Sequence, residues 1–219
     1  NPNLQQIPAR HKELGPMIRS LFIPEEKCIW GCFDYSQQEP RILVHFASLM
    51  KLEGTGSIVG AYNDGSADFH QMIADMAGIE RKQAKTINLG IMYGMGKNKL
   101  MAELGLRKDD AEELLKTYHQ RAPFVKMLSE AVSRRADDSG KIRTIGGRLC
   151  HFDLWEPRKF GINKPLKLDE ALREHGPGIK RAFTYKALNK LIQGSAADMT
   201  KKSMLALYQE GVIPHVQIH

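Results

Sequence analysis

Four residues recur at every fourth position between residues 81 and 93, and their types suit the binding of a nucleotide. Two of them are cations, Arg81 and Lys85, one is aliphatic, Leu89, and one is aromatic, Tyr93. In an α-helix, residues spaced by four rise about 6 Å per step and form one slowly rotating stripe. The cations of such a stripe can hold phosphates while the apolar residues lie beside a sugar and a base. The alternative is an exposed basic turn that leads into an ordinary core face.

A carboxylate at the end of an apolar run is the second candidate. Asp34 follows residues 29–33, Ile-Trp-Gly-Cys-Phe, which we predict to be a buried central strand. A carboxylate at the end of a buried strand is costly unless it is compensated, and a divalent cation compensates it well. A turn or capping Asp is the alternative. Glu39 also has a structural alternative, because it stands three residues after Ser36, the spacing of a capping box.

The elements that must position these residues form a mostly helical α+β fold. Strands at the two ends of the chain are expected to form one sheet, with the helical middle inserted between them. We predict strands at residues 17–23 and 28–34, a hairpin at 141–152, and a final strand after Gly211. The predicted helices run from the capping box through Leu49 and then over 68–77, 80–95, 97–103, 108–135 and 179–210. Residues 54–66 and 156–178 are expected to be loops.

Composition limits the class of protein. The 219 residues carry 32 Lys and Arg against 25 Asp and Glu, a net charge of +7, which suits a nucleic-acid or polyphosphate partner. No apolar run approaches the roughly 20 residues that a bilayer crossing needs, so no membrane partner is expected. The three cysteines form no CxxC pair, which favours a reducing compartment. The chain starts without Met and stops inside an apolar stretch, so we interpret it as a piece of a longer polypeptide.

Five segments, in order along the chain, resemble the motifs of family A DNA polymerases. Residues 34–41, Asp-Tyr-Ser-Gln-Gln-Glu-Pro-Arg, resemble motif A, and residues 81–94 resemble motif B, R-x-x-x-K-x-x-x-F/Y-G-x-x-Y-G. Residues 193–198, Gln-Gly-Ser-Ala-Ala-Asp, are similar to the QGTAAD helix of the family. Residues 3–8 resemble the segment before motif A, and residues 216–219 resemble motif C, broken before its acidic pair. Together these segments span nearly the whole chain.

The resemblance implies a polymerase palm sheet with an inserted helical fingers subdomain, an incomplete right-hand fold. Residues 1–50 and 177–219 would be palm, and residues 51–176 would be fingers. The chemistry would be nucleotidyl transfer with two Mg²⁺ ions, for which Mn²⁺ is a substitute, stabilising the attacking and leaving oxygens. Asp34 would bind both ions, and the backbone carbonyl of Tyr35 would bind one.

The resemblance also implies roles for residues around the incoming deoxynucleoside triphosphate. Lys85 would be catalytic, contacting the triphosphate and donating a proton to pyrophosphate. Glu39 would exclude ribonucleotides and hydrogen-bond Tyr93. The residues implied to bind the nucleotide are Arg81, Lys85, Leu89, Tyr93, Glu39, His70 and Gln37. The residues implied to contact primer-template DNA, partly through acceptors in the minor groove, are Asn3, Gln5, Asn189, Gln193 and His219.

This sequence departs from the family pattern at three positions. Leu89 stands where most members carry Phe or Tyr, so the ring that would stack on the nucleotide is missing. Leu at this place occurs in some phage-like and organellar relatives. Pro40 replaces the usual Leu, which a first helical turn tolerates, and Tyr185 stands where the family often has a DNA-contacting Arg.

The function implied is that of a template-directed DNA polymerase in phage-type replication or in repair, with the isolated 219 residues inactive. We expect a monomer that binds primer-template DNA and deoxynucleotides, in the cytoplasm of a bacterial cell or phage-infected host, or in a plastid-type organelle. One alternative is a single-subunit RNA polymerase, against which Glu39 argues because an RNA-making enzyme needs room for a 2′-hydroxyl. Another is a non-enzymatic, basic helical DNA-binding module, which predicts no metal dependence.

Overall fold

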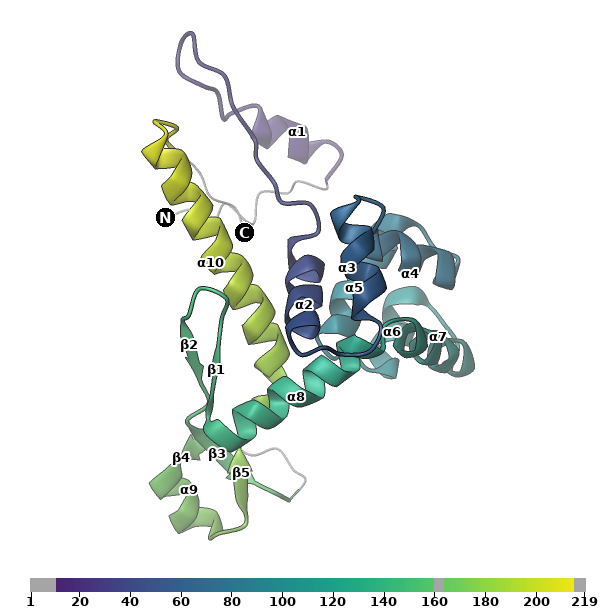
Figure 1. The fold of residues 1–219 in the computed structure, drawn as a ribbon, viewed down its shortest axis with the longest axis vertical. Coiled ribbons are helices and arrows are strands. Elements are labelled where there is room, and N and C mark those ends of the chain that lie inside the picture. Colours follow the sequence, from purple (N-terminus) through teal and green to yellow (C-terminus); the bar gives the residue numbers. More distant parts are fainter. Residues whose placement is uncertain (1–10, 160–163, 215–219) are drawn as a thin grey trace. The chain divides into compact units, whose positions relative to one another are not determined.

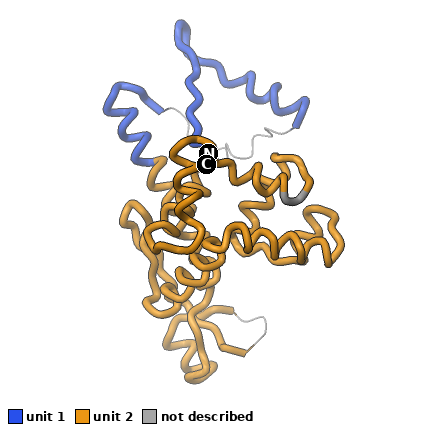
Figure 2. Tube along the Cα trace, turned by 45° about the vertical axis from the view of Figure 1, so that its right-hand side comes forward, with its two compact units in different colours: residues 1–36, 201–219 blue, residues 37–200 orange. Residues whose placement is uncertain are grey.

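The computed structural model describes residues 11–159 and 164–214, in a chain that divides into two compact units (Figure 2). The first unit contains residues 1–36 and 201–219, and the second contains residues 37–200. This division by compactness differs from the predicted division into palm and fingers, which stays a prediction.

The chain is mostly helical with small antiparallel sheets, which confirms the predicted fold class (Figure 1). The helices of the described residues are α1 (Leu14–Arg19), α2 (Gln38–Leu49), α3 (Thr55–Asn63), α4 (Phe69–Ala77), α5 (Arg81–Met92), α6 (Lys97–Leu104), α7 (Lys108–Arg121), α8 (Pro123–Ser139), α9 (Leu168–His175) and α10 (Ala187–Gln209). A 3₁₀ turn at Thr184–Lys186 precedes α10. Among the helices of the described part of the chain, none is long and apolar enough to cross a bilayer.

Two small antiparallel sheets belong to the second unit. One pairs β1 (Lys141–Arg143) with β2 (Leu149–His151), which confirms the hairpin predicted at residues 141–152. The other has the order β4 (Leu166–Lys167), β3 (Leu154–Pro157) and β5 (Ile179–Arg181), and α9 packs beside it (Figure 1).

The hydrophobic core of the second unit lies among its helices. Figure 1 shows α2 to α7 grouped around the first half of α8, while the β1–β2 hairpin lies near its end. The core draws large, fully buried side chains from several helices: Leu43, Ile73, Met92, Leu100, Tyr118, Leu128 and Ile192. Burial on this scale is the main favourable contribution to folding and fixes how the helices face one another.

Two predictions about the helical region were wrong. Residues 54–66 were predicted to be a loop, but α3 occupies most of them, because Thr55 and Tyr62 are buried against the core and outweigh the weak helix propensity of Gly and Asn. The single helix predicted over 108–135 is two helices, α7 and α8. Pro123 is the first residue of α8, where its missing N–H costs nothing, but it cannot continue the preceding helix.

The prediction of a loop at 156–178 and a helix over 179–210 was wrong in part. Residues 166–175 form β4 and α9, and residues 179–181 form β5, so the long helix begins only at Ala187. The reason is the pairing of β5 and β4 with β3. Hydrogen bonds between segments far apart in sequence override the local helical pattern.

The strands predicted at 17–23 and 28–34 were also wrong. Helix α1 covers part of the first range, and residues 28–34 form no strand. A strand needs a neighbour for its backbone hydrogen bonds, and the described residues of the first unit contain none. Ile29 is therefore 92% exposed and Phe33 75% exposed. Between the two ranges the chain makes a turn, in which the Cys28 N–H donates to the Glu25 carbonyl at 2.9 Å.

The strand predicted after Gly211 is likewise not formed at residues 212–214, and residues 215–219 lie outside the described residues. The sheet expected from the two ends of the chain is therefore absent from the described residues, for the same lack of paired neighbours.

The predicted capping box at the start of α2 was wrong. The helix begins at Gln38, and its N-cap is Gln37 in the left-handed conformation, with φ of 53°, rather than Ser36. The Gln37 amide instead accepts from the Phe69 N–H at 3.1 Å and from the Tyr62 hydroxyl at 3.3 Å, and donates to the Ala67 carbonyl at 3.1 Å. Gln37 thus fixes the start of α2 to the connection between α3 and α4. In this structure a predicted nucleotide contact serves the fold.

The first turn of α2 also contains Pro40, one of the departures from the family pattern. Its side chain is buried, and its place in the first turn requires no hydrogen bond from its nitrogen. The helix tolerates this proline as expected.

Residues 193–198, the segment similar to the QGTAAD helix, fix the β1–β2 hairpin to α10. The Asp198 carboxylate accepts hydrogen bonds from the Thr144 hydroxyl and from Arg148 Nε, the latter at 3.0 Å. Burial alone would raise the pKa of Asp198, but these hydrogen bonds and the Arg148 charge outweigh it and lower the pKa. Asp198 is therefore a charged anchor for the tip of the hairpin.

The same segment supplies a close backbone approach. A Cβ added at Gly194 would meet Thr144 Cγ2 at 2.9 Å, so a larger residue would push the hairpin away. The neighbouring Ser195 hydroxyl accepts from the Ile145 N–H at 3.0 Å. Small and polar residues at these positions let the hairpin lie directly against α10.

We expect Asp198→Asn to loosen the hairpin, because an amide keeps the size of the side chain but loses the charge-assisted hydrogen bonds. The local loss should be about 1–2 kcal/mol. Amide hydrogen exchange over residues 141–151 should accelerate, whereas Asp138→Asn on the exposed surface of α8 should leave it unchanged. Because the pKa of Asp198 is lowered by folding, its contribution is present above its unfolded pKa and is lost as pH falls through the folded value. Unchanged exchange in Asp198→Asn at neutral pH would contradict the anchor.

Candidate functional site

The stripe predicted between residues 81 and 93 lies on α5, and its two halves have different environments. Arg81 and Lys85 are exposed in the first half of the helix. Leu89 and Tyr93 are half-buried and pack against the hydrophobic core. The helix predicted at this place is confirmed, with Tyr93 as its C-cap. The stripe thus presents two cations to solvent at one end and apolar surface at the other.

Nearby residues explain where α5 begins and where it ends. At the start, the Glu80 N–H donates to Gln83 Oε1 at 3.2 Å. At the end, Met95 folds back over the helix, and a Cβ added at Gly90 would meet Met95 Cε at 2.1 Å. Gly94 has φ of +83°, a conformation that glycine adopts without strain. These glycines let the chain turn sharply behind Tyr93.

Arg81 is paired with the residue that caps the neighbouring helix. Arg81 Nε lies 2.8 Å from Asp68 Oδ2, and Asp68 Oδ1 accepts from the N–H groups of His70 and Gln71 at 3.0 Å each. Burial would raise the pKa of Asp68, but the hydrogen bonds from Arg81 and from the two N–H groups lower it. One carboxylate therefore caps α4 and fixes the first cation of the stripe.

His70 is buried rather than presented at the surface. Its side chain is 3% exposed, and its Nδ1 lies 3.3 Å from the side-chain nitrogen of Asn88. Burial and the charge of Arg81 lower the pKa of His70, the charge of Asp68 opposes them, and Lys85 lowers it further. The ring is therefore neutral at pH 7. Its predicted role in binding the nucleotide stays a prediction.

Tyr93 and Glu39 form the second meeting point of predicted residues. The Tyr93 hydroxyl is buried and has no hydrogen bond of ordinary geometry among the described residues. Burial raises the pKa of Tyr93, and the neighbouring charge and acceptor oxygens of Glu39 raise it further. The structure therefore places Glu39 of α2 beside Tyr93 at the end of α5, but the predicted hydrogen bond between them is not formed with ordinary geometry.

The predicted metal-binding residues, Asp34 and Tyr35, belong to the first unit. The side chains of Asp34 and Tyr35 are exposed, and the Tyr35 hydroxyl is hydrogen-bonded to Ser203. Mg²⁺ is commonly held by one or two carboxylates together with substrate phosphates and waters. Asp34 fits this chemistry as one ligand. No group of three or more His, Cys, Asp or Glu side chains within the described ranges is arranged to hold a metal.

The predicted DNA contacts that the structure describes lie on α10. Asn189 is half-buried and Gln193 is exposed, and they share one face because they are four residues apart. Tyr185, which stands in place of the family Arg, is 69% exposed, with Lys186 Nζ lying 5.5 Å from its ring centroid. Asn3, Gln5 and His219 lie outside the described residues.

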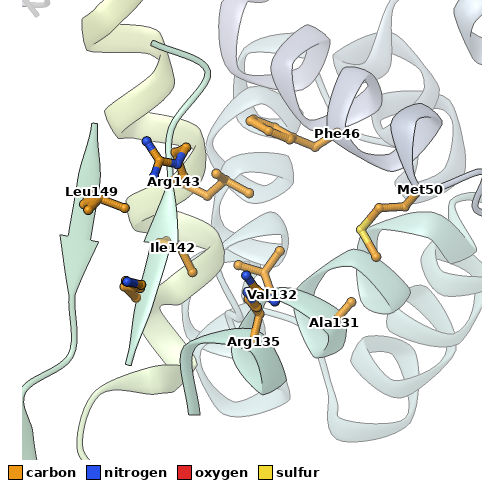
Figure 3. A pocket seen from close by; sticks show the side chains of 10 residues that line it. Phe46, Met50, Ala131, Val132, Arg135, Ile142, Arg143 and Leu149 are labelled. Carbon is orange, nitrogen blue, oxygen red and sulfur yellow. The ribbon is translucent and has the colours of Figure 1, made fainter. Parts of the chain in front are cut away.

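A cavity of about 450 Å³ lies elsewhere in the second unit, among α2, α8, α10 and the β1–β2 hairpin (Figure 3). Figure 3 shows Phe46 of α2 and Met50, the residue that follows α2, facing Val132 of α8 and Leu149 of β2 across it. None of the predicted site residues lines it. This apolar cavity is therefore separate from the stripe on α5.

Two buried residues of the site region were missed from the sequence. Asn88 and Tyr118 are both fully buried, and the Tyr118 hydroxyl donates to Asn88 Oδ1 at 3.2 Å. Asn88 stands within the motif B segment, one residue before Leu89. A polar residue at a core position of an amphipathic helix is a signal for a buried network, but its partners are not visible in the sequence.

The amino-acid sequence of this chain is similar to the sequences of known DNA polymerases. The sequence model described as DNA polymerase family A matches residues 1–217. A DNA-directed DNA polymerase of Pseudomonas phage M6 is 38% identical to this chain over 261 residues, covering 100% of the chain and 36% of the phage protein. DNA polymerase I of Lactococcus lactis subsp. lactis is 32% identical over 218 residues, covering 94% of this chain and 22% of that protein.

The fold has a solved counterpart. The POL domain of Pol1 from M. smegmatis, in complex with DNA primer-template and dNTP, superposes with a TM-score of 0.67 and 27% sequence identity. The match covers 96% of this chain and 35% of that one. This chain thus spans about a third of the length of the phage relative and of the solved structure.

We expect Asp68→Ala to destabilise the second unit by about 1–2 kcal/mol, because it removes the cap of α4 together with the partner of Arg81. Urea unfolding at pH 7 measures the loss. Since folding lowers the pKa of Asp68, the difference from wild type should persist above the unfolded pKa and shrink as pH falls through the folded value. Asp75→Ala, on an exposed position of the same helix, is the control. Equal losses in both variants would show that Asp68 has no special role.

Proposed function

Because this chain belongs to the family A DNA polymerases, we propose that it carries the nucleotide-binding helix and part of the catalytic centre of a template-directed DNA polymerase. The observation that supports this best is the stripe on α5, with Arg81 and Lys85 exposed at one end and Tyr93 beside Glu39 at the other. The complete protein would add deoxynucleotides to the 3′ end of a primer.

In this proposal the exposed half of α5 binds the triphosphate. Arg81 contacts the outer phosphates, and its half-exposed pair with Asp68 is weak enough to be exchanged for them. Lys85 contacts the phosphates as a point charge and donates a proton to the leaving pyrophosphate. Leu89 and Tyr93 lie beside the sugar and the base, with Leu89 supplying apolar contact but no aromatic stacking.

The reaction proposed is attack of the primer 3′-oxygen on the α-phosphorus. A new P–O bond forms, the bond to the bridging oxygen breaks, and pyrophosphate leaves. Asp34 and the backbone carbonyl of Tyr35 would hold two Mg²⁺ ions, for which Mn²⁺ can substitute. When bound, these ions stabilise the charge on the attacking and leaving oxygens.

Glu39 is proposed to close the space beside the 2′ position of the sugar. Its burial in the first turn of α2 is intermediate, and its carboxylate lies beside the buried Tyr93 hydroxyl. A side chain in such a place excludes a 2′-hydroxyl by size and by desolvation of its charge. This selectivity favours a DNA polymerase over an RNA polymerase.

DNA is proposed to lie along the exposed face of α10, with Asn189 and Gln193 contacting the minor groove. Hydrogen bonds from the β1–β2 hairpin to Gly194, Ser195 and Asp198 would hold that face of α10 in place. The relatives come from phages and bacteria, which supports a bacterial or phage-infected cell as the setting. Both replication and repair are compatible with these relatives.

We expect Asp34→Ala in the complete polymerase to reduce single-nucleotide incorporation by at least about a hundredfold, because the variant loses the carboxylate for the metal ions. Binding of primer-template DNA, measured by fluorescence anisotropy, should change little. The control is Glu26→Ala, which removes an exposed carboxylate from the same segment. An Asp34→Ala enzyme that keeps a tenth of the wild-type turnover would remove Asp34 from the metal site.

We expect Glu39→Ala to raise the ratio of ribonucleotide to deoxyribonucleotide kcat/KM by about tenfold or more, because space opens beside the sugar. Correct incorporation should also slow as Tyr93 loses its neighbour. Glu39→Gln keeps the size of the side chain and should retain most of the discrimination. An unchanged ratio in Glu39→Ala would show that Glu39 does not close the space beside the sugar.

A further inference from the structure

Three helices meet in a buried polar network that the stripe on α5 does not explain. His70 comes from α4, Asn88 from α5 and Tyr118 from α7, and their side chains are 3%, 0% and 0% exposed. Polar side chains are kept at such depth when they are hydrogen-bonded, and here each contacts the next. The network ends at a histidine that lies beside the two cations of the stripe.

The hydrogen bonds determine which ring nitrogen carries the proton. The Tyr118 hydroxyl donates to Asn88 Oδ1 at 3.2 Å, which turns Asn88 Nδ2 toward His70 Nδ1 at 3.3 Å. An amide nitrogen donates and does not accept, so Nδ1 must be the acceptor. The proton of the neutral imidazole then lies on Nε2.

We propose that Asn88 and Tyr118 are positioning residues that hold His70 as the neutral Nε2–H tautomer, a hydrogen-bond donor for a phosphate oxygen of the incoming nucleotide. This inference rests on the proposed function and assigns to Asn88 and Tyr118 a role that acts through His70. A fixed donor costs less to organise at the moment of binding than a ring free to change tautomer.

The charges around the ring explain why a neutral donor suits this place. Arg81 and Lys85 of α5 already supply positive charge, and Asp68 at the start of α4 supplies the negative charge that opposes them. From α7, the titratable group near the ring is Tyr118, which reaches His70 only through Asn88. Burial and the two cations lower the pKa of His70, so its donor is present without an imidazolium across pH 7 to 9.

Asn88→Asp tests the tautomer in the complete polymerase. A carboxylate accepts from Nδ1–H and raises the pKa of the ring, so the neutral ring would then present an unprotonated Nε2 to the phosphates. We expect the nucleotide KM of this variant to rise about tenfold between pH 7 and pH 9, beyond any change in wild type. The control is Asn98→Asp on the exposed surface of α6. A pH profile of Asn88→Asp that matches this control would overturn the inference.

Tyr118→Phe tests the far end of the network with a substitution that conserves the ring. Loss of the hydroxyl frees the Asn88 amide to rotate, so nucleotide KM should rise about three- to tenfold with a smaller change in kcat. Thermal unfolding shows whether the variant is folded. An unchanged KM in a folded Tyr118→Phe enzyme would exclude Tyr118 from positioning His70.

A direct measurement does not depend on activity. Nitrogen-15 spectra of the histidine-labelled polymerase, with His70 assigned from a His70→Asn variant, distinguish Nε2–H from Nδ1–H in the neutral ring. The Nε2–H pattern is expected, and the Nδ1–H pattern would overturn the inference. A wild-type enzyme that incorporates no nucleotide would instead defeat the proposed function, so the two failures are distinguishable.

Discussion

The polar contact between α4 and α5 is the constraint on which the candidate site depends. Asp68 caps α4 and holds Arg81 at 2.8 Å, while His70 and Asn88 connect the same helices below the surface. The outer contact is half-exposed and therefore worth little, on the order of 1 kcal/mol or less, whereas the inner one is buried and cannot be broken cheaply. In the proposed function, phosphates would therefore displace Asp68 from Arg81 without separating the helices. The arrangement combines an exchangeable surface pair with a fixed interior.

How much of the fold is visible in the sequence depends on whether the cause is local. Helices α4, α5 and α6 follow from periodicity and capping, and the β1–β2 hairpin follows from its two glycines. The strands at 17–23 and 28–34 could not be predicted correctly, because a strand is defined by its neighbour and the described residues supply none. The break at Pro123 has a local cause, because a proline disfavours the helical conformation of the residue before it. The pairing of β3 with β4 and β5 is distant and left no local signal.

The residues of the candidate site also differ in whether their relation is local in the sequence. Arg81, Lys85 and Tyr93 are related by helical spacing alone, so their stripe could be predicted from the sequence. Asn88 and Tyr118 are thirty residues apart, and nothing in either sequence neighbourhood shows that they meet. The segment 193–198 was interpreted through its likeness to a DNA-contacting helix. The hydrogen bond of its Asp198 to the hairpin could not be predicted from the sequence, because only the folded chain brings Arg148 Nε within 3.0 Å.

Leu89 explains why the remaining contacts of α5 must be well fixed. An aromatic ring stacked on a base contributes on the order of 1–3 kcal/mol, and a leucine supplies packing without that stacking. Leu89 is half-buried against the core, so its shape serves the protein as much as a ligand. If α5 binds the nucleotide as proposed, more of the nucleotide binding energy would come from the phosphate end and from the Tyr93–Glu39 pair. Neighbouring helices hold α5 in both regions. His70 of α4 and Tyr118 of α7 contact Asn88 of α5. Glu39 of α2 lies beside Tyr93 at the end of α5.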